Sequence, residues 1–406
     1  MAWRNIWRNP RRSILTICAI AFASLLLVFM LSWQFGSYDV MINASVKIST
    51  GHIQVQTKNY QEKRDMRLVV RDPEALYSLL ENTPEVASHT SRANAFSLVS
   101  SENRTYGVLV VGIDPLREAN VSTLKKLIRQ GSYLSPGDWD QALVGALLAK
   151  NLRVGLGDEL VILGQGLDGS VAATVVKVKG IFSSGQDEFD RSTIRIPLKY
   201  FQDVYGMDSA VHEVVALGKS LKQVQEIKSK ITAGIKNTNK EESLVVLDWM
   251  ELIPGLIQAI QMDLISGFIF YIILIVVVAF SILNTFLMAV FERTREFGVL
   301  LAVGTTPGRL AKLLIFESST ITILGIVFGI ILGSLVTWYF QVHGILISGA
   351  SELMRHYGLP ERMYPQLSML SISIGAGIVL IITILTALYP AFKSKRLRPV
   401  EAMKAV

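Results

Sequence analysis

Four long apolar stretches constrain the fold of this chain more than any other feature of its sequence. They cover about residues 13–34, 264–290, 312–340 and 367–390. Each is close to the roughly 20 apolar residues that cross a bilayer as a helix. A fully buried core helix could imitate one of them. Four such stretches, each ending in charged or turn-rich sequence, predict a membrane protein with four transmembrane helices.

The long segment between the first two stretches, residues 35–263, is predicted to be a separate folded domain. A β-α-β pattern opens it at about 44–101, starting with a strand at Val46–Thr57, and another closes it at about 210–247. Two such units often pair into one α/β sandwich. The stretch between them, about 102–209, is a strand-rich insertion. The predicted fold class is therefore an α-helical membrane protein with a large extracytoplasmic α+β domain inserted between helices 1 and 2.

Positive charge is concentrated at the two ends of the chain. Met1–Arg12 carries four arginines and no acid, and Lys393–Val406 carries five basic residues and one glutamate, against a whole-chain net charge of +7. Basic residues beside membrane spans mark the cytoplasmic side. Both termini are thus predicted to be cytoplasmic. Nucleic-acid binding would also account for basic ends, but not for their position beside apolar spans.

The shorter segments complete the predicted topology. Trp3, Ile6 and Trp7 share one helical face, which fits an interfacial helix on the inner leaflet, although a simple positive flank accounts for the same residues. The segments are an interfacial helix at 1–12, a cytoplasmic helix and loop at 291–311, an external loop at 341–366 and a cytoplasmic basic tail at 391–406.

The segment between the second and third spans is predicted to contain a short amphipathic helix, Phe291–Val303. Gly304 and the Thr-Thr-Pro-Gly that follows it are expected to end this helix. Its apolar side would carry Phe291, Phe297, Leu300 and Leu301, and its charged end Glu292, Arg293, Arg295 and Glu296. A connecting loop with a solvated charge cluster explains the same residues equally well.

Two further patterns concern how the spans are built. Asp248 can cap a helix that leads into the second span, and Pro254 should kink that helix or mark its true start. The third span contains Gly325, Gly329 and Gly333, a spacing that lets helices approach closely. The helix that packs against these glycines belongs either to the same chain or to a second copy.

Polar residues within the spans leave alternatives open. Ser281, Asn284 and Thr285 in the second span fit hydrogen bonding across a helix interface better than a transport path. Glu317, near the inner end of the third span, can pair with Lys312 or a lipid headgroup, or can belong to a surface that transmits motion.

No catalytic, cofactor-binding or metal-binding residue is predicted. A Walker A motif is absent, so the chain is not expected to hydrolyse ATP by itself through that motif. Gly164, Gly166 and Gly169 match GxGxxG, but a β-branched strand follows them instead of a helix, so a turn is expected there. The histidines are scattered without metal-ligand spacing.

The run AFSILNTFLMAVFERTREFGVLLAVGTTPGRL, Ala279–Leu310, resembles the FtsX/MacB-type ABC transporter permeases, which work by mechanotransmission. The third-span sequence LLIFESSTITILGIVFGIILGSL and the ending YPAFKSKRLRPVEAMKAV resemble the same family. In the external block, GHIQVQ, VVGIDP, ALVGALLAKNLRVGLGDEL and IFSSGQDEFDRSTIRIPL are similar to the lipoprotein-releasing permeases LolC and LolE. The resemblance covers nearly the whole chain.

This resemblance implies a non-catalytic inner-membrane subunit with a MacB-like periplasmic core domain. It would pair with a second permease copy or paralogue, as a homodimer or heterodimer. It would also bind a separate LolD-like ABC ATPase, which would bind ATP and Mg²⁺ and hydrolyse the ATP. The coupling helix would contact that ATPase through Phe291, Glu292, Arg293, Arg295, Glu296, Gly298 and Gly304. The implied substrate is a lipoprotein, extracted for transfer to the outer membrane.

The acyl chains of this lipoprotein would lie between the upper ends of the first two spans. The candidate contacts are Phe29, Met30, Trp33, Met262, Ile265 and Phe268, which also fit plain lipid-facing or packing residues. In the lipoprotein-releasing family, one permease docks its carrier through a protruding hook. The corresponding turn here, Gly164–Ser170, is short, which favours a LolE-like role over direct docking of a periplasmic carrier. The alternatives are a MacB-like efflux permease for peptides or antibiotics, and an FtsX-like regulator of a cell-wall hydrolase.

Overall fold

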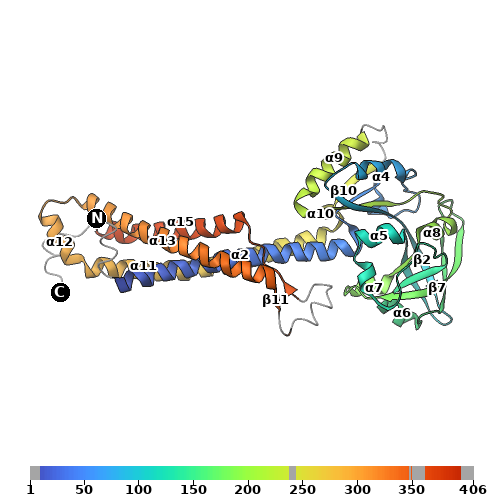
Figure 1. The fold of residues 1–406 in the computed structure, drawn as a ribbon, viewed down its shortest axis with the longest axis horizontal. Helices are drawn as coiled ribbons and strands as arrows, with labels where there is room; N and C mark the ends of the chain where they lie inside the picture. Colours follow the sequence, from blue (N-terminus) through green and yellow to red (C-terminus); the bar gives the residue numbers. More distant parts are fainter. Residues whose placement is uncertain (1–9, 237–243, 347–348, 350–361, 395–406) are drawn as a thin grey trace. The chain divides into compact units, whose positions relative to one another are not determined.

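The computed structural model describes residues 10–236, 244–346, 349 and 362–394, and these residues fall into two compact units (Figure 1). The helical unit contains the described residues up to Tyr38, those of Ala259–Leu346 and those from Arg362 onward. The α/β unit contains Asp39–Gln258. The interfacial helix predicted for 1–12 lies outside the described residues except for its last three, and the basic tail beyond Ser394 lies outside them entirely.

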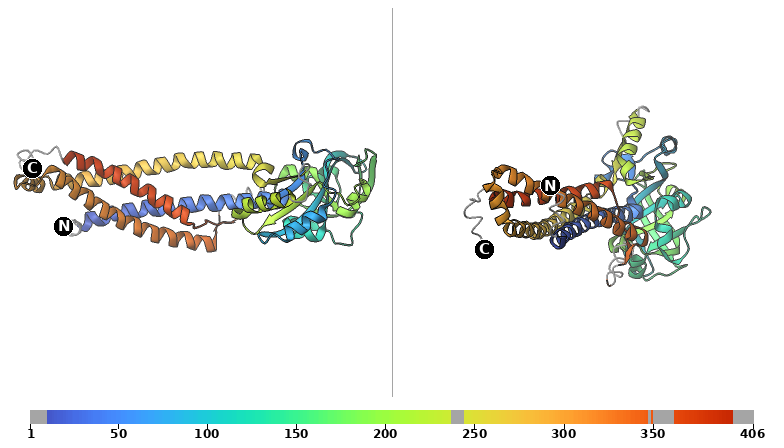
Figure 2. Two further views of the ribbon diagram at one scale, coloured as in Figure 1. Left: turned by 90° about the horizontal axis from the view of Figure 1, so that it is seen from above. Right: turned by 60° about the vertical axis from the view of Figure 1, so that its left-hand side comes forward.

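Four long helices make up the helical unit and lie side by side (Figures 1 and 2). They are α2 (Pro10–Ser45), α11 (Pro254–Glu292), α13 (Pro307–His343) and α15 (Met369–Ser394), of which α2 and α11 also extend into the α/β unit. All four are long and apolar enough to span a membrane, as the sequence predicts. Their shared core contains Ile20, Leu27, Ile282, Phe286, Ile321, Ile326, Val379 and Ala387. A short strand pair, β11 (Ile345–Leu346) and β12 (Arg362–Met363), follows α13.

The three glycines of α13 lie against α2 of the same chain. A methyl group built at Gly329 would lie 2.6 Å from the carbonyl oxygen of Ala21, and one at Gly325 would lie 2.7 Å from Cβ of Ile20. At Gly333 the nearest atom is Cα of Leu25, at 3.1 Å. Of the two partners left open by the sequence, these contacts are therefore within the chain.

The α/β unit is built on one mixed sheet of ten strands. Along its main path the order is β10-β1-β9-β2-β3-β8-β5-β7-β4, and β6 pairs with β2 and β7. The strands are β1 (Ile53–Thr57), β2 (Val86–Ser100), β3 (Thr105–Ile113), β4 (Ile128–Gly131), β5 (Gln141–Gly145), β6 (Glu159–Gln165), β7 (Val171–Phe182), β8 (Thr193–Pro197), β9 (Glu213–Gly218) and β10 (Leu244–Asp248). The pairs β3–β8 and β5–β7 are parallel, and the other pairs are antiparallel.

Short helices connect these strands. They are α3 (Tyr60–Lys63), α4 (Pro73–Glu81), α5 (Pro115–Val121), η2 (Leu124–Leu127), α6 (Ala146–Leu152), α7 (Asp187–Ser192), α8 (Leu198–Val204), η3 (Leu221–Gln223), α9 (Val224–Lys236) and α10 (Trp249–Leu252). The strands β1, β2, β9 and β10 belong to the two predicted β-α-β patterns and lie adjacent in the sheet. The segment 102–209 supplies β3–β8, which continue the same sheet.

The strand predicted at Val46–Thr57 is wrong in its first half. Val46–Thr50 is a π-helical turn, η1, that continues α2, and only Ile53–Thr57 is a strand. Val46 and Ile48 alternate with polar residues as in a strand, but both are buried by the helical turn. Gly51 ends the helix with φ of +69° and donates its N–H to the carbonyl of Val46 at 2.8 Å. A left-handed φ of this kind favours glycine.

Asp248 caps the helix that precedes the second span. Its carboxylate accepts hydrogen bonds from the N–H groups of Met250 and Glu251, and Glu251 bonds back to the N–H of Asp248, which completes a capping box. This helix, α10, ends after one turn, and α11 then starts at Pro254. Of the two roles predicted for Pro254, it therefore marks the true start of the long helix.

Candidate functional site

The segment between α11 and α13 forms a short helix, α12 (Thr294–Ala302). The helix α11 runs on to Glu292, so the break falls at Arg293, two residues after the predicted helix start. At the other end Gly304 has φ of +102°, and the N–H of Thr305 bonds to the carbonyl of Leu300 at 3.0 Å. Gly304 thus occupies the left-handed position that ends a helix.

One side of α12 is held against the spanning helices by a small apolar cluster. Phe297 is fully buried and packs with Val290 of α11 and Leu310 of α13, while Leu301 lies partly buried beside them. Gly298 is also buried. These contacts fix α12 to both neighbouring helices.

Glu317 of α13 pairs with Arg293, a partner that the sequence did not suggest. The Nη1 atom of Arg293 donates to both carboxylate oxygens, at 3.0 and 2.9 Å. Its Nε lies 3.4 Å from Glu296, and its guanidinium lies over the ring of Phe297. Arg293 therefore faces inward, toward α13.

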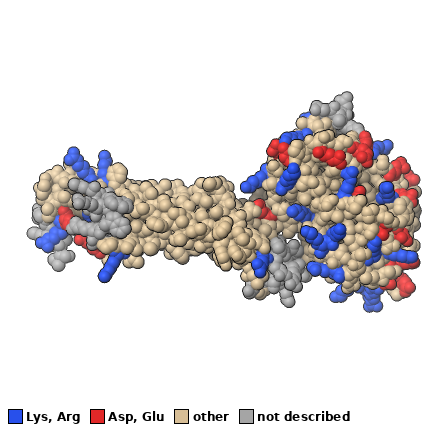
Figure 3. Space-filling model, viewed as in Figure 1, with Lys and Arg blue, Asp and Glu red and all other residues tan. Residues whose placement is uncertain are grey.

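The opposite side of α12 presents an exposed surface. Phe291, Val299 and Leu300 are between 40% and 51% exposed, and Val303 is 81% exposed. Arg295 is also exposed. On the face drawn in Figure 3, charged side chains gather at the α12 end of the helical unit and are missing from the middle of the helices. Apolar side chains beside charged ones at such an end are typical of a docking surface for a protein.

A groove of about 590 Å³ lies between α2 and α11 within the helical unit. Its walls are largely apolar, and the residues along it are Phe29, Met30, Trp33, Gln34, Ser37, Asp263, Ser266, Gly267, Phe270, Tyr271 and Ile345. Three of the six residues proposed from the sequence, all on α2, line this groove. A volume of this size is in the range of ligand pockets in proteins.

The other three proposed residues lie outside the groove. Met262, Ile265 and Phe268 are each more than 60% exposed and are not among the residues that line it. The residues of α11 that do line the groove follow a spacing of three and four, from Asp263 to Tyr271, which is one helical face. The prediction from position along the chain located the correct end of α11. It did not identify the side of α11 that faces the groove, which depends on the rotation of the helix about its own axis.

A chain of hydrogen bonds crosses the polar end of the groove. The Tyr38 hydroxyl donates to Asp263 at 2.7 Å, Gln34 donates through Nε2 to the Tyr38 oxygen at 2.8 Å, and Tyr271 donates to Oε1 of Gln34 at 2.8 Å. A methyl group at Gly267 would lie 2.7 Å from Nε2 of Gln34, so glycine permits this close approach. The groove is therefore amphipathic, with apolar walls and one carboxylate, Asp263, at its polar end.

The strands β6 and β7 carry a second exposed apolar surface, in the α/β unit. Phe96 and Leu98 of β2 share it with Leu163 and Val161 of β6 and Val175 of β7, and each is at least 44% exposed. The register places Leu98 opposite Leu163 and Val161 opposite Val175, so these side chains share one sheet face. Gly166 and Gly169 lie in the hairpin turn between β6 and β7, as predicted, whereas Gly164 still belongs to β6.

Within the described ranges, no group of three or more His, Cys, Asp or Glu side chains is placed to hold a metal ion. The sites that the structure does form are surfaces and grooves, made of apolar side chains with a few polar groups.

Four spanning helices, a large α/β domain between the first two and a short helix between the second and third define a multi-pass membrane permease. The family model described as MacB-like periplasmic core domain matches residues 13–233, more than half of the chain. The model described as FtsX-like permease C-terminal matches residues 268–399. The chain belongs to the FtsX/MacB family of ABC transporter permeases, whose members are transport components.

Curated relatives extend this similarity over most of the chain. The lipoprotein-releasing system transmembrane protein LolC of Xylella fastidiosa (strain Temecula1) is 24% identical over 342 residues, 80% of each chain. LolC of Neisseria meningitidis serogroup B is 23% identical, covering 84% of this chain and 81% of the relative. The uncharacterized ABC transporter permease YknZ of Bacillus subtilis is 27% identical over 70% of this chain and 67% of its own.

Among solved structures, the periplasmic region of MacB from Actinobacillus actinomycetemcomitans matches with a TM-score of 0.38 and 14% identity. The match covers 50% of this chain and 90% of that structure.

Proposed function

We propose that this chain is the permease subunit of an ATP-driven complex that extracts lipoproteins from the inner membrane for transfer to the outer membrane. The observation that carries the proposal is the groove between α2 and α11. Its apolar walls suit acyl chains, and the single carboxylate of Asp263 beside Gln34 and Tyr38 suits the polar head of a lipidated protein. Relatives named for lipoprotein release support the same substrate.

The energy for extraction would come from a separate LolD-like ATPase docked on α12. Phe291, Val299, Leu300 and Val303 supply exposed apolar contacts, and Arg295 supplies an exposed charge. Glu292 and Glu296 lie on the same short segment. In this proposal Gly298 and Gly304 shape the helix and its end, and Arg293 transmits the movement of α12 to α13.

The subunit would be placed with both termini in the cytoplasm and the α/β unit in the periplasm. A second permease, identical or paralogous, would cover part of the exposed apolar side of α11, which includes Phe268, Ile269, Ile272 and Ile273. A periplasmic carrier would bind on the exposed apolar sheet face at Phe96 and Leu163, and not at the short turn Gly164–Ser170.

Efflux of peptides or antibiotics is the second candidate, supported by the match to a MacB-like periplasmic core domain. The two candidates differ in the chemistry of the cargo. An acylated protein must reach its site from the lipid phase, whereas a soluble peptide need not.

A matched pair of variants on α11 tests the proposal. Ser266 lines the groove, and its neighbour Ile265 is 65% exposed and lies outside it. The complex with its ATPase is reconstituted in proteoliposomes containing a labelled triacylated lipoprotein, and ATP-dependent release is measured. We expect Ser266→Trp to abolish release and Ile265→Trp to retain it. Equal release by both variants would contradict the assignment of the groove, and absence of lipoprotein release by the unmodified complex would favour efflux.

A further inference from the structure

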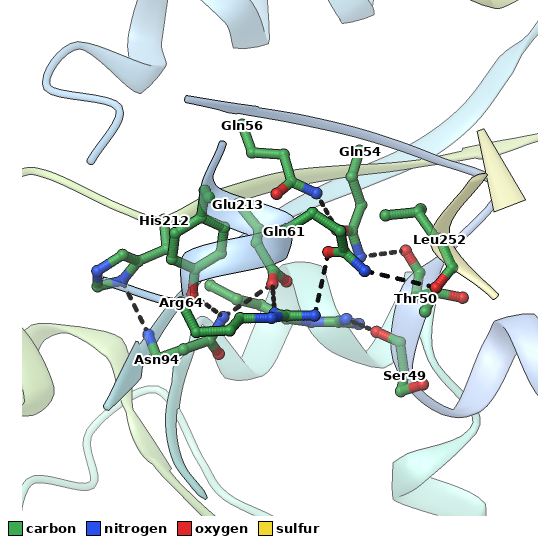
Figure 4. Close-up of polar contacts among 12 residues, drawn as sticks. Ser49, Thr50, Gln54, Gln56, Gln61, Arg64, Asn94, His212, Glu213 and Leu252 are labelled. Atoms are coloured by element: carbon green, nitrogen blue, oxygen red, sulfur yellow. Dashed lines mark hydrogen bonds and ion pairs between the residues drawn. The ribbon is translucent and has the colours of Figure 1, made fainter. Parts of the chain in front are cut away.

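A row of buried polar side chains crosses one face of the sheet in the α/β unit (Figure 4). Gln56 on β1 lies opposite Glu213 on β9, which lies opposite Arg92 on β2. Asn94 lies on β2 two residues beyond Arg92, opposite Val111 on β3. Val111 in turn lies opposite Arg195 on β8. The four charged or amide side chains on β2, β8 and β9 are no more than 9% exposed. Side chains of this kind are rarely buried unless they are paired.

The two buried arginines of this row share one carboxylate. Arg92 makes a two-bond contact with Glu118 of α5, at 2.8 and 3.0 Å, and Arg195 reaches the same carboxylate at 3.4 Å. The buried carboxylate of Glu213 pairs at 3.2 Å with Arg64, whose side chain is 37% exposed. Arg195 makes the longest of these contacts and has no carboxylate of its own.

The electrostatics of the two buried partners agree with this imbalance. Burial opposes the ionisation of Glu118, but the guanidiniums of Arg92 and Arg195 outweigh it and hold the pKa of Glu118 below its usual range. Burial, followed by repulsion from Arg92, lowers the pKa of Arg195 to about 10. The charged groups that act on Arg195 are Arg92, Glu118 and Glu213.

Several buried polar atoms have no hydrogen-bond partner among the described residues, and two of them belong to residues of one cavity beside this row. They are Nε of Arg195, whose residue is 2% exposed, and Oγ1 of Thr50 at the end of η1. Both residues line a cavity of about 250 Å³, together with Ser49, Arg92 and Ser192. Leaving a buried donor unsatisfied costs about 1–3 kcal/mol, and more for a charged group. The cavity, which Glu213 also lines, therefore contains unused donors beside a guanidinium that shares its carboxylate with Arg92.

We propose that this cavity binds a small oxyanion, a phosphate or carboxylate group, held by Arg195 and by the hydroxyl of Thr50. A guanidinium presents its N–H groups in a plane that matches such an anion, and a bound anion would give Arg195 a negative partner that it does not share with Arg92. Thr50 is the last residue of η1, and Arg92 also donates to the carbonyl of Ser49. A bound oxyanion would therefore fasten the end of the α2–η1 helix to β8. This proposal is independent of the transported substrate.

Thermal unfolding of the full chain in nanodiscs of phosphatidylcholine tests the site. Inorganic phosphate and acetate are titrated separately at constant ionic strength, with chloride as the balancing anion. We expect a saturable rise of the unfolding midpoint with at least one of them, and the two arms distinguish phosphate from carboxylate. Thr50→Val should weaken the apparent affinity for the anion about tenfold, as expected for the loss of one hydrogen bond to a charged group.

Arg195→Met should abolish the response, and Arg129→Met, an exposed arginine on β4, should leave it unchanged. If Arg195→Met does not fold, Thr50→Val alone decides. The proposal is overturned if neither anion gives a saturable rise, which would mean that the cavity holds water only. It is also overturned if Thr50→Val or a folded Arg195→Met variant responds like the unmodified chain.

Discussion

Arg293 donates from one guanidinium nitrogen to both carboxylate oxygens of Glu317, across the bend that joins α11 to α13. The two side chains are only 12% and 8% exposed. Arg293 is the residue immediately before α12, and Glu317 lies within the third span. The pair therefore ties the start of the proposed coupling helix to a spanning helix, next to the apolar contacts of Phe297.

Removal of one partner of this pair should be costly. Glu317→Gln leaves a largely buried guanidinium without its carboxylate, so we expect a loss of about 2–4 kcal/mol in the free energy of unfolding. ATP-driven release should fall as well, because α12 loses a connection to α13. Unfolding of the detergent-solubilised chain and release in proteoliposomes measure the two effects.

The double variant Arg293→Met with Glu317→Met is the control for this pair. It removes both charges, so stability should recover relative to Glu317→Gln, while release should stay low. If release is normal in the stable double variant, the pair has no part in transmitting motion.

A substitution on the exposed side of α12 should weaken binding of the ATPase without affecting the fold. Val303 is 81% exposed, so Val303→Asp removes no internal contact of consequence. A side chain at the centre of a protein interface can contribute 2 kcal/mol or more, so we expect binding of the ATPase to weaken about 30-fold. Affinity is measured between the permease in nanodiscs and the purified ATPase.

A second variant tests the charged residues of α12 and replaces both Arg295 and Glu296 with alanine. We expect release to be uncoupled from ATP hydrolysis while the unfolding midpoint stays within a degree or so. Unchanged release in this variant would remove α12 from the coupling proposal.

The glycines of α13 offer a prediction about helix packing. Gly329→Ala places a methyl group 2.6 Å from the carbonyl oxygen of Ala21, so α2 and α13 must separate. We expect a loss of about 1–3 kcal/mol in stability. Gly377→Ala on α15 is the matched control, because a methyl group there meets no atom within 4 Å. Equal stability of the two variants would show that close contact at Gly329 is dispensable.

The sequence predicts the parts of this fold that depend on local pattern. Apolar length locates the four spans, and the Asp248 cap and Pro254 mark the start of α11. It did not select the groove-facing side of α11. That side carries Asp263, Ser266 and Gly267, whereas Met262, Ile265 and Phe268 are apolar and exposed. The prediction took apolar residues as acyl-chain contacts, but in a spanning helix small and polar residues are the ones that tend to face a partner helix.

The polar row of the sheet could not be predicted from the sequence either, for a different reason. Arg92, Glu118, Arg195 and Glu213 come from segments that are far apart in the chain and meet only through strand register. Arg293 and Glu317 are closer in sequence, but their pairing depends on the bend at α12. The helical turn at Val46–Thr50 was missed because its alternation also fits a strand, and tertiary contact decided between the two.

Two buried histidines predict how the stability of the α/β unit changes with pH. Burial, and to a lesser degree Lys47, lower the pKa of His52 to about 4, and burial lowers the pKa of His212 to about 4. Each accepts a backbone N–H through Nδ1, from Gly218 and Asn94 respectively, at 3.0 Å. The folded chain therefore keeps both rings neutral at pH values where the unfolded chain, with an ordinary pKa near 6.5, already binds a proton.

Because the unfolded state binds more protons between about pH 6.5 and 4, stability should be complete above this window and fall as the pH drops through it. Each histidine can contribute roughly 3 kcal/mol to this loss. Thermal unfolding of the full chain at successive pH values measures it. His212→Gln should flatten the profile, and His343→Gln, at the exposed end of α13, should not. A profile that keeps its full slope in His212→Gln would mean that His212 is not the group that titrates.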